Sequence, residues 1–171
     1  MANSGTGGIR YYGVAKLGLT AAHATSATWA LGLSSGQWTL SKAAAGTTTV
    51  LTVPVPFEAP KPGFEDSKIK IIKFAYTVGA AAITTAPSFV LSTQVLSAAG
   101  ALTDSTIAKT LTFLGSDAST AGTTVASHVA ILTIDTPAAI TNLTDLILTA
   151  TIGEAASTTL QFNGLLIDYT G

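Results

Sequence analysis

Alternation of apolar and polar residues is the dominant pattern of this chain, and it predicts β-strands. The segment 47–55 is β-branched and places Thr47, Thr49, Leu51, Val53 and Val55 on one face, with Thr48, Val50 and Thr52 on the other. Pro54 lies near its end, which favours a sheet edge or a strand terminus. Segment 29–40 alternates in two halves around Ser34-Ser35-Gly36, which predicts a hairpin.

The second half of the chain repeats one rhythm of short β-type runs separated by turns. These runs are 67–78, 88–96, 107–114, 125–134, 143–152 and 158–169. In the first of them the apolar positions change parity near Ile71-Ile72, which predicts a β-bulge. With the earlier segments this gives about eight strands, so we expect an all-β fold, an antiparallel β-sandwich of jelly-roll type. An immunoglobulin-like sandwich is the alternative.

Two segments interrupt the strand pattern. Residues 1–28 are rich in Gly, Ala, Ser and Thr, and we expect them to form an extended N-terminal arm that contacts a neighbouring surface. Residues 29–171 then form a single sandwich domain. The Pro-rich loop 54–66 lies inside this domain, because its prolines and glycine exclude regular structure there.

Composition removes several classes of function. Charged residues make up only 10% of the 171 residues, against about 25% in an average soluble domain, and the net charge is -1. Because no basic cluster exists, nucleic acid is not an expected partner. The chain has no Cys, no apolar run of about 18 residues and no signal-peptide pattern at Met1–Arg10. We therefore expect no membrane span and synthesis in a cytoplasm.

Catalysis has little support in the sequence. His128 is the obvious general base, with Ser127 or Ser116 as nucleophile and Asp135 as the acid, but no Gly-x-Ser-x-Gly elbow is present. Ser127 and His128 also fall on opposite faces of a strand. We predict no catalytic residues, no enzyme activity and no cofactor.

Dispersed acids leave one open alternative for a metal. Asp104, Asp117 and Asp145 fall in predicted turns, and a calcium site would require them to converge with further oxygens. No zinc or phosphate-binding motif occurs. We expect no bound metal.

Aromatic residues outside the expected core are the candidate contact anchors. They are Tyr11, Tyr12, Trp29, Trp38, Phe57 and Phe64, the last two flanking the Pro-rich loop. Such side chains are typical of protein contacts and, in exposed rows, of carbohydrate binding.

The later part of the chain resembles a known kind of protein. The features are the opening strand Ile69–Thr84, the Thr/Ala-rich β-runs and the ending Leu160–Tyr169. Together they resemble head-decoration or minor-capsid proteins of tailed bacteriophages and related viruses. The resemblance implies a β-sandwich, often trimeric, that binds a capsid lattice and has no catalytic residues.

Our first hypothesis is therefore a structural virion protein, a capsid decoration, cement or minor capsid subunit located in the virion. Its partners would be the major capsid protein or neighbouring copies of itself in a homo-oligomer, with a trimer favoured. The second hypothesis is a carbohydrate-binding or adhesin module. The third is an extracellular filament subunit, in which residues 1–28 complete the sheet of a neighbour.

Overall fold

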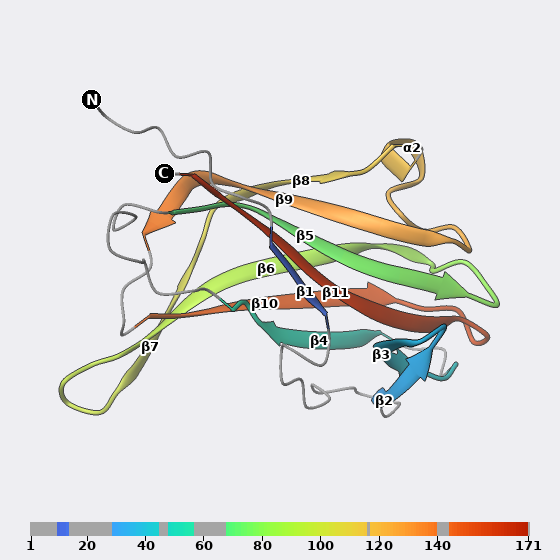
Figure 1. The fold of residues 1–171 in the computed structure, drawn as a ribbon, viewed down its shortest axis with the longest axis horizontal. Helices are drawn as coiled ribbons and strands as arrows, with labels where there is room; N and C mark the ends of the chain where they lie inside the picture. The colour runs from blue at the N-terminus through green and yellow to red at the C-terminus, as the bar shows by residue number, and fades with distance from the viewer. Residues whose placement is uncertain are drawn as a thin grey trace.

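The protein is a sandwich of two antiparallel β-sheets (Figure 1). A computed structural model describes residues 10–13, 29–44, 48–56, 68–115, 117–139 and 144–170. The described strands are β1 (Arg10–Gly13), β2 (Trp29–Ser34), β3 (Gln37–Lys42), β4 (Thr49–Pro54), β5 (Lys68–Gly79), β6 (Thr85–Leu96), β7 (Leu102–Thr106), β8 (Lys109–Phe113), β9 (Ser127–Ala139), β10 (Thr144–Gly153) and β11 (Thr159–Thr170), with the short helix α2 (Asp117–Thr120). The all-β, antiparallel sandwich prediction is confirmed.

The strands divide into a larger and a smaller sheet. Sheet A has the order β2-β3-β11-β5-β9-β8, with β1 also paired to β11, and sheet B has the order β4-β10-β6-β7. Their inner faces enclose one hydrophobic core, in which Phe74 stacks on Phe162 at 4.6 Å between ring centroids. Phe89 of sheet B meets Phe74 edge-on at 5.2 Å, which joins the two sheets.

The sequence pattern predicted β4 and β5 correctly. Leu51 and Val53 of β4 are buried as the alternation predicts, and β4 is an edge strand that ends at Pro54. The parity change in β5 is a β-bulge, since the pairing with β9 shifts between Ile69 and Ile71. Ile69 and Ile72 consequently both face the core.

The β2–β3 hairpin has a two-residue turn. Ser35 and Gly36 both have positive φ, 51° and 77°, as a type I′ turn requires. Ser34 pairs with Gln37 across this turn, so the predicted hairpin is confirmed.

The predicted arm is partly incorporated into the sandwich. Strand β1 pairs antiparallel with β11 of its own chain, from Arg10 opposite Ile167 to Gly13 opposite Gly164. These four residues therefore complete their own sheet, contrary to the expected contact with a neighbour. The remainder of the arm and residues 57–66 of the Pro-rich loop lie outside the described residues, so the division at residue 28 stays a prediction.

A buried ion pair links the two sheets. Lys42, the last residue of β3, contacts the carboxylate of Glu154, which follows β10, and neither side chain is exposed to solvent. The Lys42 ammonium also donates to the carbonyl of Ala43 at 3.2 Å. Glu154 Oε1 has no hydrogen-bond partner among the described residues. A charge buried away from water requires an opposite charge beside it. The Lys42–Glu154 pair therefore constrains how sheet A packs on sheet B.

Removing one partner of this pair should destabilise the fold strongly. Glu154→Ala should lower the free energy of unfolding by about 3–5 kcal/mol, because it leaves a buried ammonium without a counter-charge. The double variant Lys42→Met with Glu154→Leu should recover most of this loss. Urea denaturation of the three proteins measures both effects, and a double variant no more stable than the single one would contradict the prediction.

Candidate functional site

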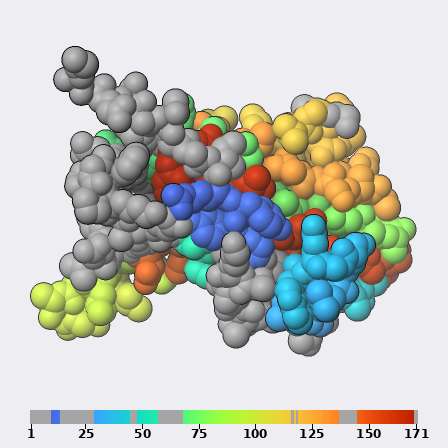
Figure 2. All heavy atoms as spheres, in the orientation of Figure 1, coloured from blue at the N-terminus to red at the C-terminus, as the bar shows by residue number. Residues whose placement is uncertain are grey.

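The outer face of sheet A carries an exposed tyrosine held against the backbone. Tyr11 of β1 is 52% exposed, and its hydroxyl donates to the carbonyl of Asn163 at 2.8 Å. The ring lies against both glycines: a Cβ at Gly164 would come within 3.1 Å of Tyr11 Cε2, which is a tight contact, whereas one at Gly13 would make an ordinary contact at 3.4 Å from Cε1. Figure 2 shows β1 at the front of the molecule.

A β-bulge in β11 creates this arrangement. The pairing of β11 with β5 shifts between Phe162 and Gly164, and Gly164 has a φ of 143°, in the region that favours glycine. The bulge brings the backbone of β11 close to that of β1, since a Cβ at Gly164 would lie 2.5 Å from the carbonyl oxygen of Tyr12. A glycine is therefore required at this position.

Next to Tyr11, a row of uncharged polar side chains crosses three strands. Gln161 Nε2 donates to Asn163 Oδ1 at 2.8 Å, and Asn163 Nδ2 donates to Thr77 Oγ1 at 3.1 Å. Thr77 Oγ1 is in turn 3.0 Å from Ser127 Oγ. The row thus joins β11, β5 and β9, and its side chains are exposed or half-buried. The sequence pattern alone did not predict this row, although the polar residues at 161 and 163, on either side of Phe162, indicate a face that points outward.

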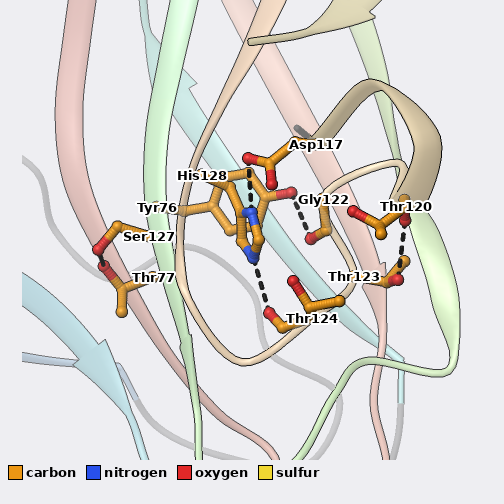
Figure 3. Close-up of polar contacts among 9 residues, drawn as sticks. All are labelled: Tyr76, Thr77, Asp117, Thr120, Gly122, Thr123, Thr124, Ser127 and His128. Carbon is orange, nitrogen blue, oxygen red and sulfur yellow. Dashed lines mark hydrogen bonds and ion pairs between the residues drawn. The ribbon is translucent and has the colours of Figure 1, made fainter. Parts of the chain in front are cut away.

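A second polar cluster lies at the α2 end of sheet A (Figure 3). His128 is buried, with Nδ1 2.7 Å from Asp117 Oδ2 and Nε2 2.7 Å from the carbonyl of Thr124. Tyr76 packs beside the imidazole at 5.2 Å between ring centroids, and its hydroxyl donates to the carbonyl of Gly122 at 2.8 Å. Burial, and secondarily the charge of Asp117, raises the pKa of Tyr76.

Both imidazole nitrogens are engaged inside the protein. A backbone carbonyl only accepts, so Nε2 donates to Thr124, while Nδ1 lies against the Asp117 carboxylate. These two contacts fasten the α2 segment to the sheet.

The residues considered for catalysis are not brought together. His128 pairs with Asp117 and not with Asp135, whose carboxylate accepts from Thr110 Oγ1 at 3.1 Å. Ser127 bonds Thr77 on the opposite face of β9, as its parity predicted. Ser116 lies outside the described residues. The described geometry thus assigns these groups to structural contacts.

The candidate calcium acids are also separated. Gln94 of β6 separates two of them, since it pairs with Asp104 of β7 on one side and with Asp145 of β10 on the other. Asp117 contacts His128 instead. Across the described ranges, no three His, Cys, Asp or Glu side chains group as metal ligands. Nor does that part of the chain include a helix long and apolar enough to cross a membrane.

The predicted contact anchors that the structure describes differ in their exposure to solvent. Trp29 is 4% exposed and belongs to the core, so its assignment to an interface is wrong; its indole faces inward beside Lys42. Tyr12 is half-buried against the same core, and its hydroxyl is enclosed. Tyr11 and Trp38 are both about half exposed, and their contact role stays a prediction. Phe57 and Phe64 lie outside the described residues.

Comparisons with known proteins give structural neighbours only. No family of proteins matches the sequence, and no curated protein matches it. A carbohydrate-binding module in complex with β-1,4-galactotriose aligns over 93% of this chain and 86% of its own, with 7% identity and a TM-score of 0.38. A structure of carbohydrate-binding modules of the β-sandwich superfamily aligns over 99% and 62%, with 11% identity and a TM-score of 0.41. A mannan-recognising module aligns over 92% and 88%, with 9% identity and a TM-score of 0.37.

These neighbours correct our first hypothesis. They are carbohydrate-binding modules and not virion proteins, so the interpretation as a capsid decoration, cement or minor capsid subunit is wrong by this comparison.

Gly164→Ala should disturb both stability and the Tyr11 ring. The positive φ and the close carbonyl of Tyr12 predict a loss of about 2 kcal/mol or more in unfolding free energy, with a changed NMR environment for the Tyr11 ring. Gly13→Ala is the matched control, because its Cβ would make only an ordinary contact with Tyr11. Equal effects of the two substitutions would contradict the role given to the bulge.

The raised pKa of Tyr76 predicts a loss of folding stability at alkaline pH. Its folded-state pKa is raised above the ordinary value of 10.0, so its stabilising contribution is complete below pH 10 and is lost as the pH rises further. Urea midpoints measured from pH 8 to 11 should therefore fall above pH 10. They should fall less in Tyr76→Phe, and an identical decline in both proteins would show that other groups cause it.

Proposed function

We propose that this protein is a non-catalytic, carbohydrate-binding β-sandwich that holds its ligand on the outer face of sheet A. One observation carries the proposal: the exposed Tyr11 ring is laid over two glycines directly beside the neutral row Gln161, Asn163, Thr77 and Ser127. This combination matches the chemistry of a sugar, which presents apolar C–H faces and hydroxyl groups together.

The tyrosine supplies the apolar half of such a site. With its hydroxyl bound to Asn163 O and its ring over Gly13 and Gly164, Tyr11 is held in one orientation before a ligand arrives. Pre-ordering lowers the entropy lost on binding. The exposed part of the ring is available to pack against a pyranose.

The polar row supplies the hydrogen-bonding groups of such a site. Each amide in the row has more donors and lone pairs than these contacts within the row use, so Gln161 and Asn163 retain hydrogen-bonding capacity toward a ligand. Adjacent strands lie about 4.8 Å apart, so a row across β11, β5 and β9 extends over about 10 Å. A surface of that length can contact a short oligosaccharide.

The proposed absence of catalysis follows from how the titratable groups are used. Both nitrogens of His128 are engaged by Asp117 and Thr124 inside the protein. A general base must reach the proton that it removes, and this imidazole is enclosed. The protein therefore acts by binding.

Tyr11→Ala should weaken glycan binding about tenfold or more, since a stacking contact of about 1.5 kcal/mol is removed. The protein would first be screened on an array of neutral oligosaccharides, and the best ligand titrated by calorimetry. Trp38→Ala is the matched control, because Trp38 is equally exposed but lies on the β2–β3 hairpin. Failure to bind any glycan, or a loss caused by Trp38→Ala and not by Tyr11→Ala, would contradict the proposed site.

A further inference from the structure

Among the described strands, one of the five edge strands lacks the features that normally prevent strand pairing. Among the described residues, no strand pairs with the outer edge of β2. Strand edges in soluble proteins usually carry a charge or a proline. The other four edge strands do so, through Arg10 in β1, Pro54 in β4, Asp104 in β7 and Lys109 in β8, whereas β2 contains neither.

The exposed edge of β2 is able to form hydrogen bonds at Leu31 and Leu33. The two-residue turn makes Ser34 and Gln37 a hydrogen-bonded pair, so the even-numbered residues of β2 direct their backbone groups toward β3. The backbone N–H and C=O groups of Leu31 and Leu33 therefore point away from the sheet. No described strand pairs with these groups, so they can form hydrogen bonds with the strand of another molecule.

The sequence of this edge is symmetric about Gly32. If two copies of β2 pair antiparallel with Gly32 on a two-fold axis, Leu31 lies opposite Leu33 of the partner subunit, and Leu33 opposite the partner's Leu31. Both pairs are hydrogen-bonded pairs, and no charge is placed against another. A Cβ at Gly32 would meet nothing within 4 Å, so the face of the strand is uncovered at this position.

We infer that the outer edge of β2 binds a second copy of this chain, forming a dimer with a two-fold axis at Gly32. The leucine side chains support this occupant: Leu31 and Leu33 are 51% and 65% exposed, and Trp38 lies directly opposite Leu33 on the same face. This apolar face continues the core-facing side of sheet A, because Leu40, opposite Leu31, packs in the core. Figure 2 shows the β2–β3 hairpin as a projection at the lower right.

The interface of the proposed dimer is short, so the dimer is weak. Two six-residue strands and one apolar strip per copy bury less than the about 1,200–2,000 Å² of a stable interface. The dimer therefore forms reversibly, at micromolar or higher protein concentration.

This dimer also orients the proposed ligand surfaces. A two-fold axis that pairs antiparallel strands in one sheet is perpendicular to that sheet, so both outer faces point the same way. If the proposed carbohydrate site is correct, a dimer presents two Tyr11 surfaces to one polymer and binds it with avidity.

Sedimentation equilibrium over a range of concentrations tests the inference directly. Wild-type protein should show a monomer–dimer equilibrium, and Leu33→Lys should be monomeric throughout, because two ammonium groups would face the interface. Leu102→Lys is the matched control: Leu102 is 67% exposed on edge strand β7 and should leave the dimer intact. Circular dichroism melts verify that both variants fold.

Three results would overturn the inference: a wild-type monomer at every concentration, dissociation by Leu102→Lys, or an assembly that Leu33→Lys leaves unchanged. A closed trimer resistant to Leu33→Lys belongs to the last case. Glycan binding is measured separately on the monomeric Leu33→Lys protein. It should persist there with weaker avidity, which distinguishes failure of the dimer from failure of the proposed function.

Discussion

The bulge at Asn163–Gly164 in β11 is the constraint on which sheet A depends. One edge of β11 pairs with β5 along its length, while the other edge is divided between β3 before the bulge and β1 after it. The positive φ of Gly164 makes this division possible, because a side chain there would strike the backbone of β1. The same residue leaves room for the Tyr11 ring, so one backbone conformation organises both the sheet and the candidate site.

Scarcity of charge gives the few ionised groups a structural role. Lys42–Glu154 joins the two sheets, and His128–Asp117 holds the α2 segment, so both pairs are used inside the protein. Buried pairs of this kind specify an arrangement more than they stabilise it. The hydrogen-bonded row through Asn163 on the outer face of sheet A is uncharged, which suits a ligand that offers hydroxyl groups and apolar faces.

Sequence patterning predicted the parts of this fold that local chemistry determines. Alternation in β4, the parity change in β5 and the turn at Ser35-Gly36 each act within a few residues. The candidate site depends instead on pairing between distant strands: Asn163 meets Thr77 across 86 positions. Strand β1 was missed because four residues in a Gly-rich segment carry too little pattern, and β7 because all of its residues are exposed.

The two tryptophans show why burial cannot be derived from strand parity alone. Trp29 and Trp38 project from the same face of the β2–β3 hairpin, yet Trp29 is buried and Trp38 is half exposed. The difference is their distance from the sandwich, since the hairpin extends its core-facing side outward as far as Leu33. The apolar residues of the hairpin therefore alternate like core residues, but sheet B does not cover them. Tyr11 lies on the other face of sheet A, so a partner could cover the hairpin while the candidate ligand surface remains accessible.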